Sequence, residues 1–237
     1  MSNSKLGGKN CGGKSPLKII LLESALELVP REVASHPQIV RSARRYGLSP
    51  AEMLLDKSIH YDAMRRLEER WKRGRPDIVH TTVLFIEDSP LFGKGMIELY
   101  IHVRDGRVFR VSGEARLPKN YERFKGLMAQ LLKKGKVPPD AEKALVYEAY
   151  DTLEKFVEDH GGLVLLSEEG RGLSPLSAVA LSIATCLPLG VGAFPAGDFR
   201  PKTKALAKYK VSLLGGKKLM TWGVVARLIY EYEKLNT

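Results

Sequence analysis

The C-terminal third of the chain alternates short apolar runs with longer helical segments, and this alternation restricts the fold more than any other sequence feature. Apolar runs at 163–166, 187–191 and 211–214 predict strands, whereas segments 176–184 and 221–235 predict helices. A loop that contains glycine follows each predicted strand. Strands that alternate with helices in this way are typical of a mostly parallel sheet, so the expected fold class is α/β.

Further apolar runs extend the predicted sheet towards the N-terminus. They lie at 17–23, 78–86, 96–103 and 108–111, and the last two are joined by a strong hairpin signal, Asp105-Gly106. Apolar spacing predicts helices at 37–46, 58–71, 121–134 and 141–158. Residues 1–15 are rich in Gly, Lys and Ser and predict a flexible basic tail. We therefore expect a single domain over 16–237, with an inserted extension in the region 88–120.

Several classes of protein are disfavoured by what the sequence lacks. No apolar run reaches the ~20 residues that a membrane span needs, and the N-terminus has no signal-peptide stretch. Two cysteines cannot form a disulfide framework or a four-cysteine zinc site, and the five histidines have no metal-like spacing. The expectation is a cytoplasmic protein that uses no metal and contacts no membrane.

Positive charge gives the first indication of a partner. The chain has 38 Lys and Arg against 27 Asp and Glu, a net charge of +11, which favours a nucleic acid. The cations gather in two clusters, Lys72, Arg73 and Arg75, and Arg116, Lys119, Arg123 and Lys125. The first cluster is equally consistent with the solvent-exposed end of a helix that binds nothing. The second lies at a predicted helix start, where cations oppose the helix dipole unless a phosphate binds there.

The glycine-bearing loops after the predicted strands form a candidate small-molecule site. The carboxyl ends of parallel strands meet at one edge of a sheet, and glycine lets a ligand approach the backbone closely. Each loop alone could equally be a simple turn. No Walker A or dinucleotide fingerprint is present, and no Ser-His-Asp or Cys-His arrangement is discernible. Asp88, which follows the predicted strand 78–86, is the candidate for contact with the substrate, although Asp-Ser-Pro also begins turns.

Four motifs in a fixed order resemble one known family. They are Leu-Asp-Lys-Ser-Ile-His at 55–60, Gly-Arg-Pro-Asp-Ile-Val-His at 74–80, Arg-Leu-Pro-Lys-Asn-Tyr-Glu-Arg-Phe at 116–124, and Gly-Ala-Phe at 192–194 with Gly197. This pattern resembles the small-subunit ribosomal RNA pseudouridine N1-methyltransferases, which belong to the SPOUT class. The resemblance runs from about Leu17 to the C-terminus.

The resemblance implies a C-terminal trefoil knot in an α/β fold, a homodimer, and S-adenosylmethionine held by the knotted loops. The residues expected against this cofactor are Leu166, Gly192, Gly197, Leu213, Leu214, Gly215, Gly216 and Leu219. In the third loop the family often has an Asn-Tyr-Pro-Leu-like segment, whereas this chain has Gly-Gly-Lys-Lys-Leu at 215–219. Backbone contacts to the cofactor would survive that difference, but the family's side-chain contacts would not.

By the same resemblance, Arg75 contacts RNA and Asp77 orients it, while Arg116, Lys119 and Arg123 match further RNA-contact positions. The implied activity is methylation of N1 of one pseudouridine in a small-subunit rRNA hairpin loop during ribosome biogenesis, with ribosomal proteins as further partners. Asp88 is then the candidate for touching the edge of the base. The alternative is an RNA-binding assembly factor with little or no methyl transfer, which the altered third loop favours. The net charge disfavours a protein or small-molecule substrate.

Overall fold

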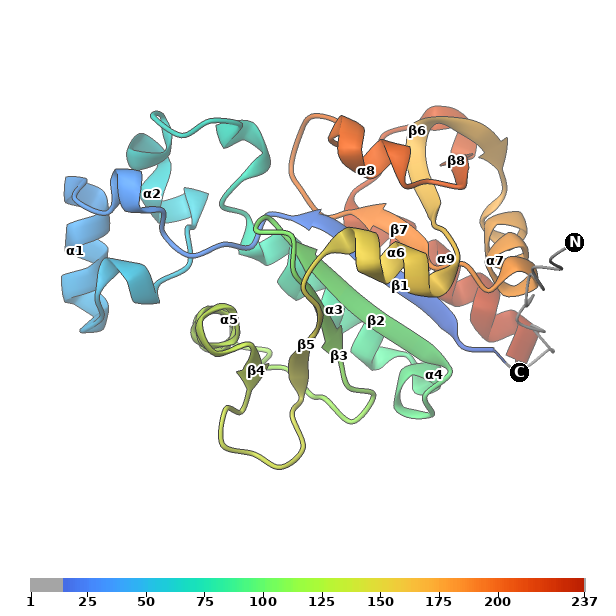
Figure 1. Ribbon diagram of the computed structural model, residues 1–237, viewed down its shortest axis with the longest axis horizontal. Coiled ribbons are helices and arrows are strands. Elements are labelled where there is room, and N and C mark those ends of the chain that lie inside the picture. Colours follow the sequence, from blue (N-terminus) through green and yellow to red (C-terminus); the bar gives the residue numbers. More distant parts are fainter. Residues whose placement is uncertain (1–14, 237) are drawn as a thin grey trace, which may run out of the picture.

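The computed structural model describes residues 15–236, which fold around one eight-stranded sheet (Figure 1). The strand order is β4-β5-β3-β2-β1-β7-β6-β8. Neighbouring strands from β2 to β8 are parallel, whereas β3, β5 and β4 pair antiparallel at the other edge. The strands are β1 (Leu17–Ser24), β2 (Ile97–Val103), β3 (Val108–Val111), β4 (Lys136–Val137), β5 (Val146–Tyr150), β6 (Val164–Leu173), β7 (Leu189–Gly192) and β8 (Tyr209–Leu213).

Helices cover both faces of the sheet, and two of them lie beyond its end (Figure 1). They are α1 (Pro37–Tyr46), α2 (Lys57–Met64), α3 (Pro76–Asp88), α4 (Pro90–Gly93), α5 (Tyr121–Lys134), α6 (Leu153–His160), α7 (Pro175–Thr185), α8 (Pro201–Ala205) and α9 (Thr221–Asn236). Short 3₁₀ turns include η3 (Arg70–Lys72) and η4 (Leu214–Gly216). Helices α1 and α2 lie apart from the sheet and share a small apolar core of their own.

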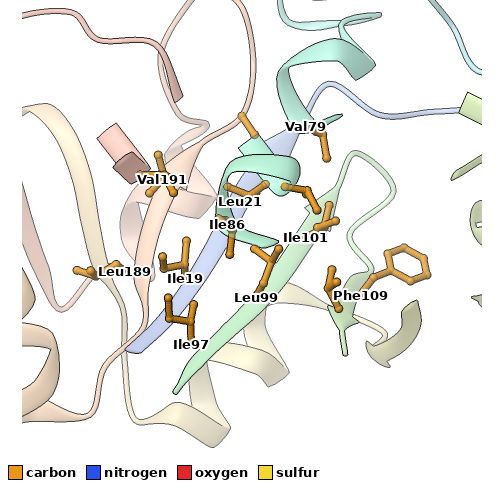
Figure 2. Packing of buried hydrophobic residues seen from close by; sticks show 14 of the residues in the cluster. Ile19, Leu21, Val79, Ile86, Ile97, Leu99, Ile101, Phe109, Leu189 and Val191 are labelled. Carbon is orange, nitrogen blue, oxygen red and sulfur yellow. The ribbon is translucent and has the colours of Figure 1, made fainter. Parts of the chain in front are cut away.

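Alternation along β1 explains how the two faces of the sheet are filled. Ile19 and Leu21 point to the face covered by α3, α7 and α9, where they pack with Leu99 and Ile101 of β2 (Figure 2). Ile20 and Leu22 point to the opposite face, which α6 covers. All of these side chains are fully buried, and each contributes about 1.5–3 kcal/mol of transfer free energy.

The α/β class predicted from the sequence is confirmed, and most predicted elements form. Helix α5 has the predicted bounds, Asp105 and Gly106 lie in the turn between the antiparallel strands β2 and β3, and Gly47 ends α1 in the left-handed conformation. Residues 88–120, expected to be an inserted extension, supply β2 and β3, which pair inside the same sheet. The expected tail lies, over residues 1–14, outside the described part of the chain.

Three sequence predictions were wrong. The helix expected over 58–71 ends at Met64, and Arg70–Lys72 form the separate turn η3. The apolar run 78–86 is not a strand but lies in helix α3, because Pro76 sits at the first helical position and Asp77 lies in the first turn. This helix is buried against the sheet and α9, so its sequence lacks a polar face and its apolar run resembles a strand. Segment 141–158 is not one helix: β5 pairs with β3, and Thr152 then caps α6 by accepting from the Lys155 N–H.

Among residues 15–236, no helix is both long and apolar enough to cross a membrane. The same residues contain no group of three or more His, Cys, Asp or Glu side chains arranged to bind a metal ion.

Candidate functional site

A cleft of about 730 Å³ opens where β6, β7 and β8 present their carboxyl-terminal residues and loops. The pairing of β6 with β8 is interrupted between Leu166 and Arg171, and residues 167–169, released by this interruption, line one side. Residues 191–199 line the second side, and the chain from Val211 to Val224 supplies the third. The cleft is therefore bordered by the three loops whose glycines the sequence analysis identified.

The second loop, residues 192–199, needs glycine at two positions. A Cβ on Gly192 would lie 3.0 Å from the Phe194 ring and 3.1 Å from the Phe199 ring. Gly197 has φ +91°, and a Cβ there would lie 3.1 Å from Nε1 of Trp71. The Gly192 carbonyl accepts a 2.7 Å hydrogen bond from the Thr221 hydroxyl, which joins this loop to the start of α9. These contacts fix the backbone that faces the cleft.

The third loop has an unusual backbone. Leu214, Gly215 and Gly216 all have positive φ (52°, 68° and 78°), so the loop reverses direction within the short turn η4. A Cβ on Gly216 would lie 3.2 Å from the Glu168 carbonyl oxygen. Of the residues expected at the cofactor, Leu166, Gly192, Gly197, Leu213, Gly216 and Leu219 line the cleft, whereas Leu214 and Gly215 do not.

Ser212 is a cleft residue that the sequence analysis missed. Its side chain is 4% exposed, it lines the cleft at the end of β8, and its Oγ has no hydrogen-bond partner among the described residues. A buried hydroxyl without a partner costs free energy, so Oγ is available to a polar ligand atom in the cleft. Its position beside the predicted loop was the only sequence signal that could have identified it.

Both charges are present around the cleft. Glu168, Glu169 and Asp198 lie on its border together with Lys217 and Lys218. Burial opposes ionisation of Asp198, but hydrogen bonds from Lys204 and from the Phe199 N–H outweigh it and lower the pKa of this carboxyl. The cleft therefore has carboxylates on its first two loops and ammonium groups on its third.

Arg75 also lines this cleft and is held by Asp77. Asp77 accepts from Nε of Arg75 at 2.8 Å and from an Nη at 2.7 Å, a two-pronged contact that raises the pKa of the guanidinium further. Arg75 is the N-cap residue of α3, and Asp77 lies in its first turn, where a carboxylate also suits the helix dipole. The structure thus brings together the two residues that the resemblance paired.

Helix α3 connects Arg75 to the second basic cluster. The ring Nε2 of His80 lies 2.8 Å from the Pro118 carbonyl, and its ring packs on Phe124 with centroids 4.4 Å apart. Tyr121 donates to the buried Asp56, which also accepts from Lys125, so the 55–60 motif anchors the start of α5. The exposed cations of this cluster, Arg116, Lys119 and Arg123, have no carboxylate within salt-bridge distance among the described residues.

The first basic cluster divides into two parts. Lys72 is buried and pairs with the buried Glu23 at 2.5 Å, and Arg73 pairs with Glu27 at 2.6 Å. The charges of Lys72 and Arg73 are therefore neutralised inside the protein. These two residues do not form a solvent-exposed helix end, and they are not free to bind an anion. Only Arg75 of this cluster faces the cleft.

The placement of Asp88 at a strand end was wrong. Asp88 is the last residue of α3, about 18 Å along the helix axis from its N-terminus, and it does not line the cleft. Its neighbour Glu87, which the sequence analysis did not identify, accepts the Leu117 N–H with both carboxylate oxygens at 3.1 Å. Burial raises the pKa of Glu87 to about 7, against the opposing effect of that hydrogen bond.

The carboxyl ends of parallel strands are where α/β proteins usually bind a ligand, and this chain has its cleft there. The profile of the EMG1/NEP1 methyltransferase family matches residues 19–233. The ribosomal RNA small subunit methyltransferase Nep1 of Aeropyrum pernix is 48% identical over 221 residues, which cover 93% of this chain and 99% of that protein. The protein of the same name from Staphylothermus marinus is 44% identical over 224 residues, covering 94% and 97%. This chain belongs to the EMG1/NEP1 methyltransferase family.

A solved structure agrees with this assignment. The crystal structure of Archaeoglobus fulgidus Nep1 bound to S-adenosylhomocysteine matches with a TM-score of 0.81 at 33% identity, and the match covers 94% of this chain and 99% of that one. The family predicted from the four sequence motifs is therefore confirmed.

Proposed function

We propose that this protein transfers a methyl group from S-adenosylmethionine to N1 of one pseudouridine in a hairpin loop of small-subunit ribosomal RNA, in the cytoplasm and during ribosome biogenesis. The observation that carries the proposal is that Arg75, fixed by Asp77, borders the same cleft as the three glycine loops. A cofactor in the cleft and a nucleotide bound by Arg75 would therefore meet. The relatives' names and the ligand of the solved relative support the same reading.

The cleft residues fit the cofactor. Ser212 offers an unpaired buried hydroxyl, and Gly192 and Gly216 leave space that a Cβ would fill. We assign the binding backbone to Leu166, Gly192, Gly197, Leu213, Gly216 and Leu219, with Ser212 as an added side-chain contact. Leu214 and Gly215, which were expected at the cofactor but do not line the cleft, shape the turn that carries Gly216. When bound, S-adenosylmethionine supplies an electrophilic methyl group.

The RNA is held by cations on two elements. Arginine has five N–H donors and Asp77 accepts two of them, which leaves three for a phosphate or a base. Arg116, Lys119 and Arg123 are exposed beside the start of α5 and suit the phosphates on either side of a loop nucleotide. A nucleotide turned out of its stack would then reach the cleft.

The reaction requires mainly orientation. In pseudouridine the sugar is attached through carbon, so N1 of the base carries a proton. N1 would bond to the methyl carbon as the bond from that carbon to the sulfonium sulfur breaks, S-adenosylhomocysteine would leave, and the N1 proton would pass to water. Holding the two reacting atoms in line supplies much of the acceleration. We also propose that the protein acts as a homodimer and that its C-terminal loops form a trefoil knot.

The proposal is tested by incubating the protein with S-adenosylmethionine labelled in the methyl group and purified ribosomal RNA of both subunits. Label should appear in small-subunit RNA alone. Label in large-subunit RNA would contradict the substrate assignment. If the protein binds small-subunit RNA tightly but transfers no label to it, the result would instead support the alternative function, an RNA-binding assembly factor.

A further inference from the structure

Trp71 lies against the second cleft loop and is exposed, although it is one of the largest apolar side chains in the chain. It lies in the turn η3 and is 55% exposed. The edge of its indole packs on Gly197 of the second cleft loop, so closely that a Cβ there would lie 3.1 Å from Nε1 and 3.2 Å from Cδ1. The indole therefore rests on a loop of the cleft and still presents much of its surface to solvent.

The turn that carries Trp71 is fixed on both sides. The next residue, Lys72, is clamped by Glu23, and its ammonium lies 4.4 Å from the centroid of the Phe194 ring in the same cleft loop. Two residues before Trp71, Glu69 is held by Arg200 at 2.5 Å and by Arg104 at 3.0 Å. An aromatic ring on such a braced turn is preorganised, so binding through it costs little conformational entropy.

The surroundings of Trp71 carry positive charge. Arg104 and Arg200 share the single carboxylate of Glu69, and Arg70, which precedes Trp71 in the same turn, is exposed. Arg75 follows four residues later and borders the cleft. An exposed aromatic ring among arginines is the combination by which proteins stack unpaired bases and hold their phosphates.

We propose that Trp71 is a stacking platform for a nucleobase of the substrate RNA, one that neighbours the nucleotide inserted into the cleft. This inference rests on the proposed RNA substrate. Trp71 is not among the residues that line the cleft, so its ligand is separate from the small molecule held there. Its contact with Gly197 places the platform directly beside the site at which the target base would enter.

Binding measurements test the platform. Trp71→Ala should weaken the affinity for an RNA hairpin with one loop pseudouridine by about 5- to 150-fold, the range expected for one stacked base, whereas Trp71→Phe should retain most of it. Affinity for S-adenosylhomocysteine should stay within about twofold in both variants. Tyr209→Ala is the matched control, because Tyr209 is 39% exposed but is the first residue of β8, whereas the cleft lies at the carboxyl end of that strand.

Fluorescence supplies a second readout, because Trp71 and Trp222 are the chain's two tryptophans and Trp222 lines the cleft. A base stacked on Trp71 should quench the fluorescence of its indole when RNA binds. In the Trp71→Phe variant this RNA-dependent decrease should disappear, while the fluorescence of Trp222 should still respond to S-adenosylhomocysteine. An abasic substitution at one loop position should weaken the wild type but not Trp71→Ala. Two results would contradict the proposed role of Trp71: normal RNA affinity in Trp71→Ala, or equal losses of affinity for RNA and for S-adenosylhomocysteine in that variant. Failure of the wild type to bind the hairpin would instead overturn the proposed function.

Discussion

Removing the Arg75 guanidinium should lower RNA-dependent turnover at least 10-fold while leaving the fold and the cofactor site nearly intact. The side chains of Arg75 and Asp77 are 32% and 40% exposed, so solvent screens their ion pair. Pairs of this kind contribute about 0–1 kcal/mol to stability. Arg75→Ala should therefore unfold within about 1 kcal/mol of the wild type in a urea titration.

The effect on turnover should be larger. Hydrogen bonds to charged groups are each worth about 1.5–3 kcal/mol, so loss of one contact from Arg75 corresponds to about a 10- to 150-fold fall in kcat/KM for RNA, and loss of two to about a 150- to 25,000-fold fall. Asp77→Asn keeps the arginine but loses the charge that orients it, and should give a smaller fall. Arg110→Ala is the matched control, since Arg110 is 39% exposed, pairs with Glu98, and lies beside Tyr100 on the face covered by α6.

The assay combines methyl transfer to RNA with calorimetric titration of S-adenosylhomocysteine. In Arg75→Ala, methyl transfer to RNA should fall while the affinity for S-adenosylhomocysteine stays within about threefold of the wild type. Equal losses of transfer and cofactor affinity in Arg75→Ala would refute the assigned role, because they would mean that Arg75 belongs to the small-molecule site. Full turnover in that variant would refute it as well.

Three further perturbations follow from the same contacts. Lys72→Met removes the ammonium that neutralises the buried Glu23 carboxylate, which keeps only the hydrogen bond from the Arg200 N–H, and should cost about 3–5 kcal/mol in denaturant unfolding. Lys72→Met combined with Glu23→Gln should recover much of that loss. Gly216→Ala forces a side chain into φ +78° against the Glu168 carbonyl and should weaken S-adenosylhomocysteine binding at least several-fold by calorimetry. Burial raises the pKa of Glu87 to about 7 from an ordinary 4.5, so its protonated form favours folding; the wild type should lose stability relative to Glu87→Gln as the pH rises from about 4.5 through 7, and identical pH profiles of the urea midpoint would contradict this assignment.

The sequence predicted the cleft better than it predicted the elements around it. Glycines after consecutive strands have a local cause, the need for positive φ or close approach, and they were therefore readable at Gly192, Gly197 and Gly216. Segment 78–86 was misread because a helix buried against the sheet and α9 has no polar face to reveal its period. The first-position Pro76 was the available signal.

Contacts between distant segments were beyond sequence reasoning. Lys72 meets Glu23 across 49 positions, and only the fold decides that this lysine is buried while Arg75, three residues later, borders the cleft. The unpaired hydroxyl of Ser212 likewise becomes visible only when the cleft is assembled. Local backbone requirements are therefore encoded in short stretches of sequence, whereas the distribution of charge around the site depends on tertiary packing.

The central claim is methylation of N1 of pseudouridine by the cleft beside Arg75. It is tested most directly with two small-subunit rRNA hairpins that are identical except for pseudouridine or uridine at one loop position. The hairpins are incubated with labelled S-adenosylmethionine, digested to nucleosides and analysed by mass spectrometry. The account predicts N1-methylpseudouridine from the first hairpin and no methylated nucleoside from the second. Equal methylation of both hairpins, or of neither while both bind, would contradict it.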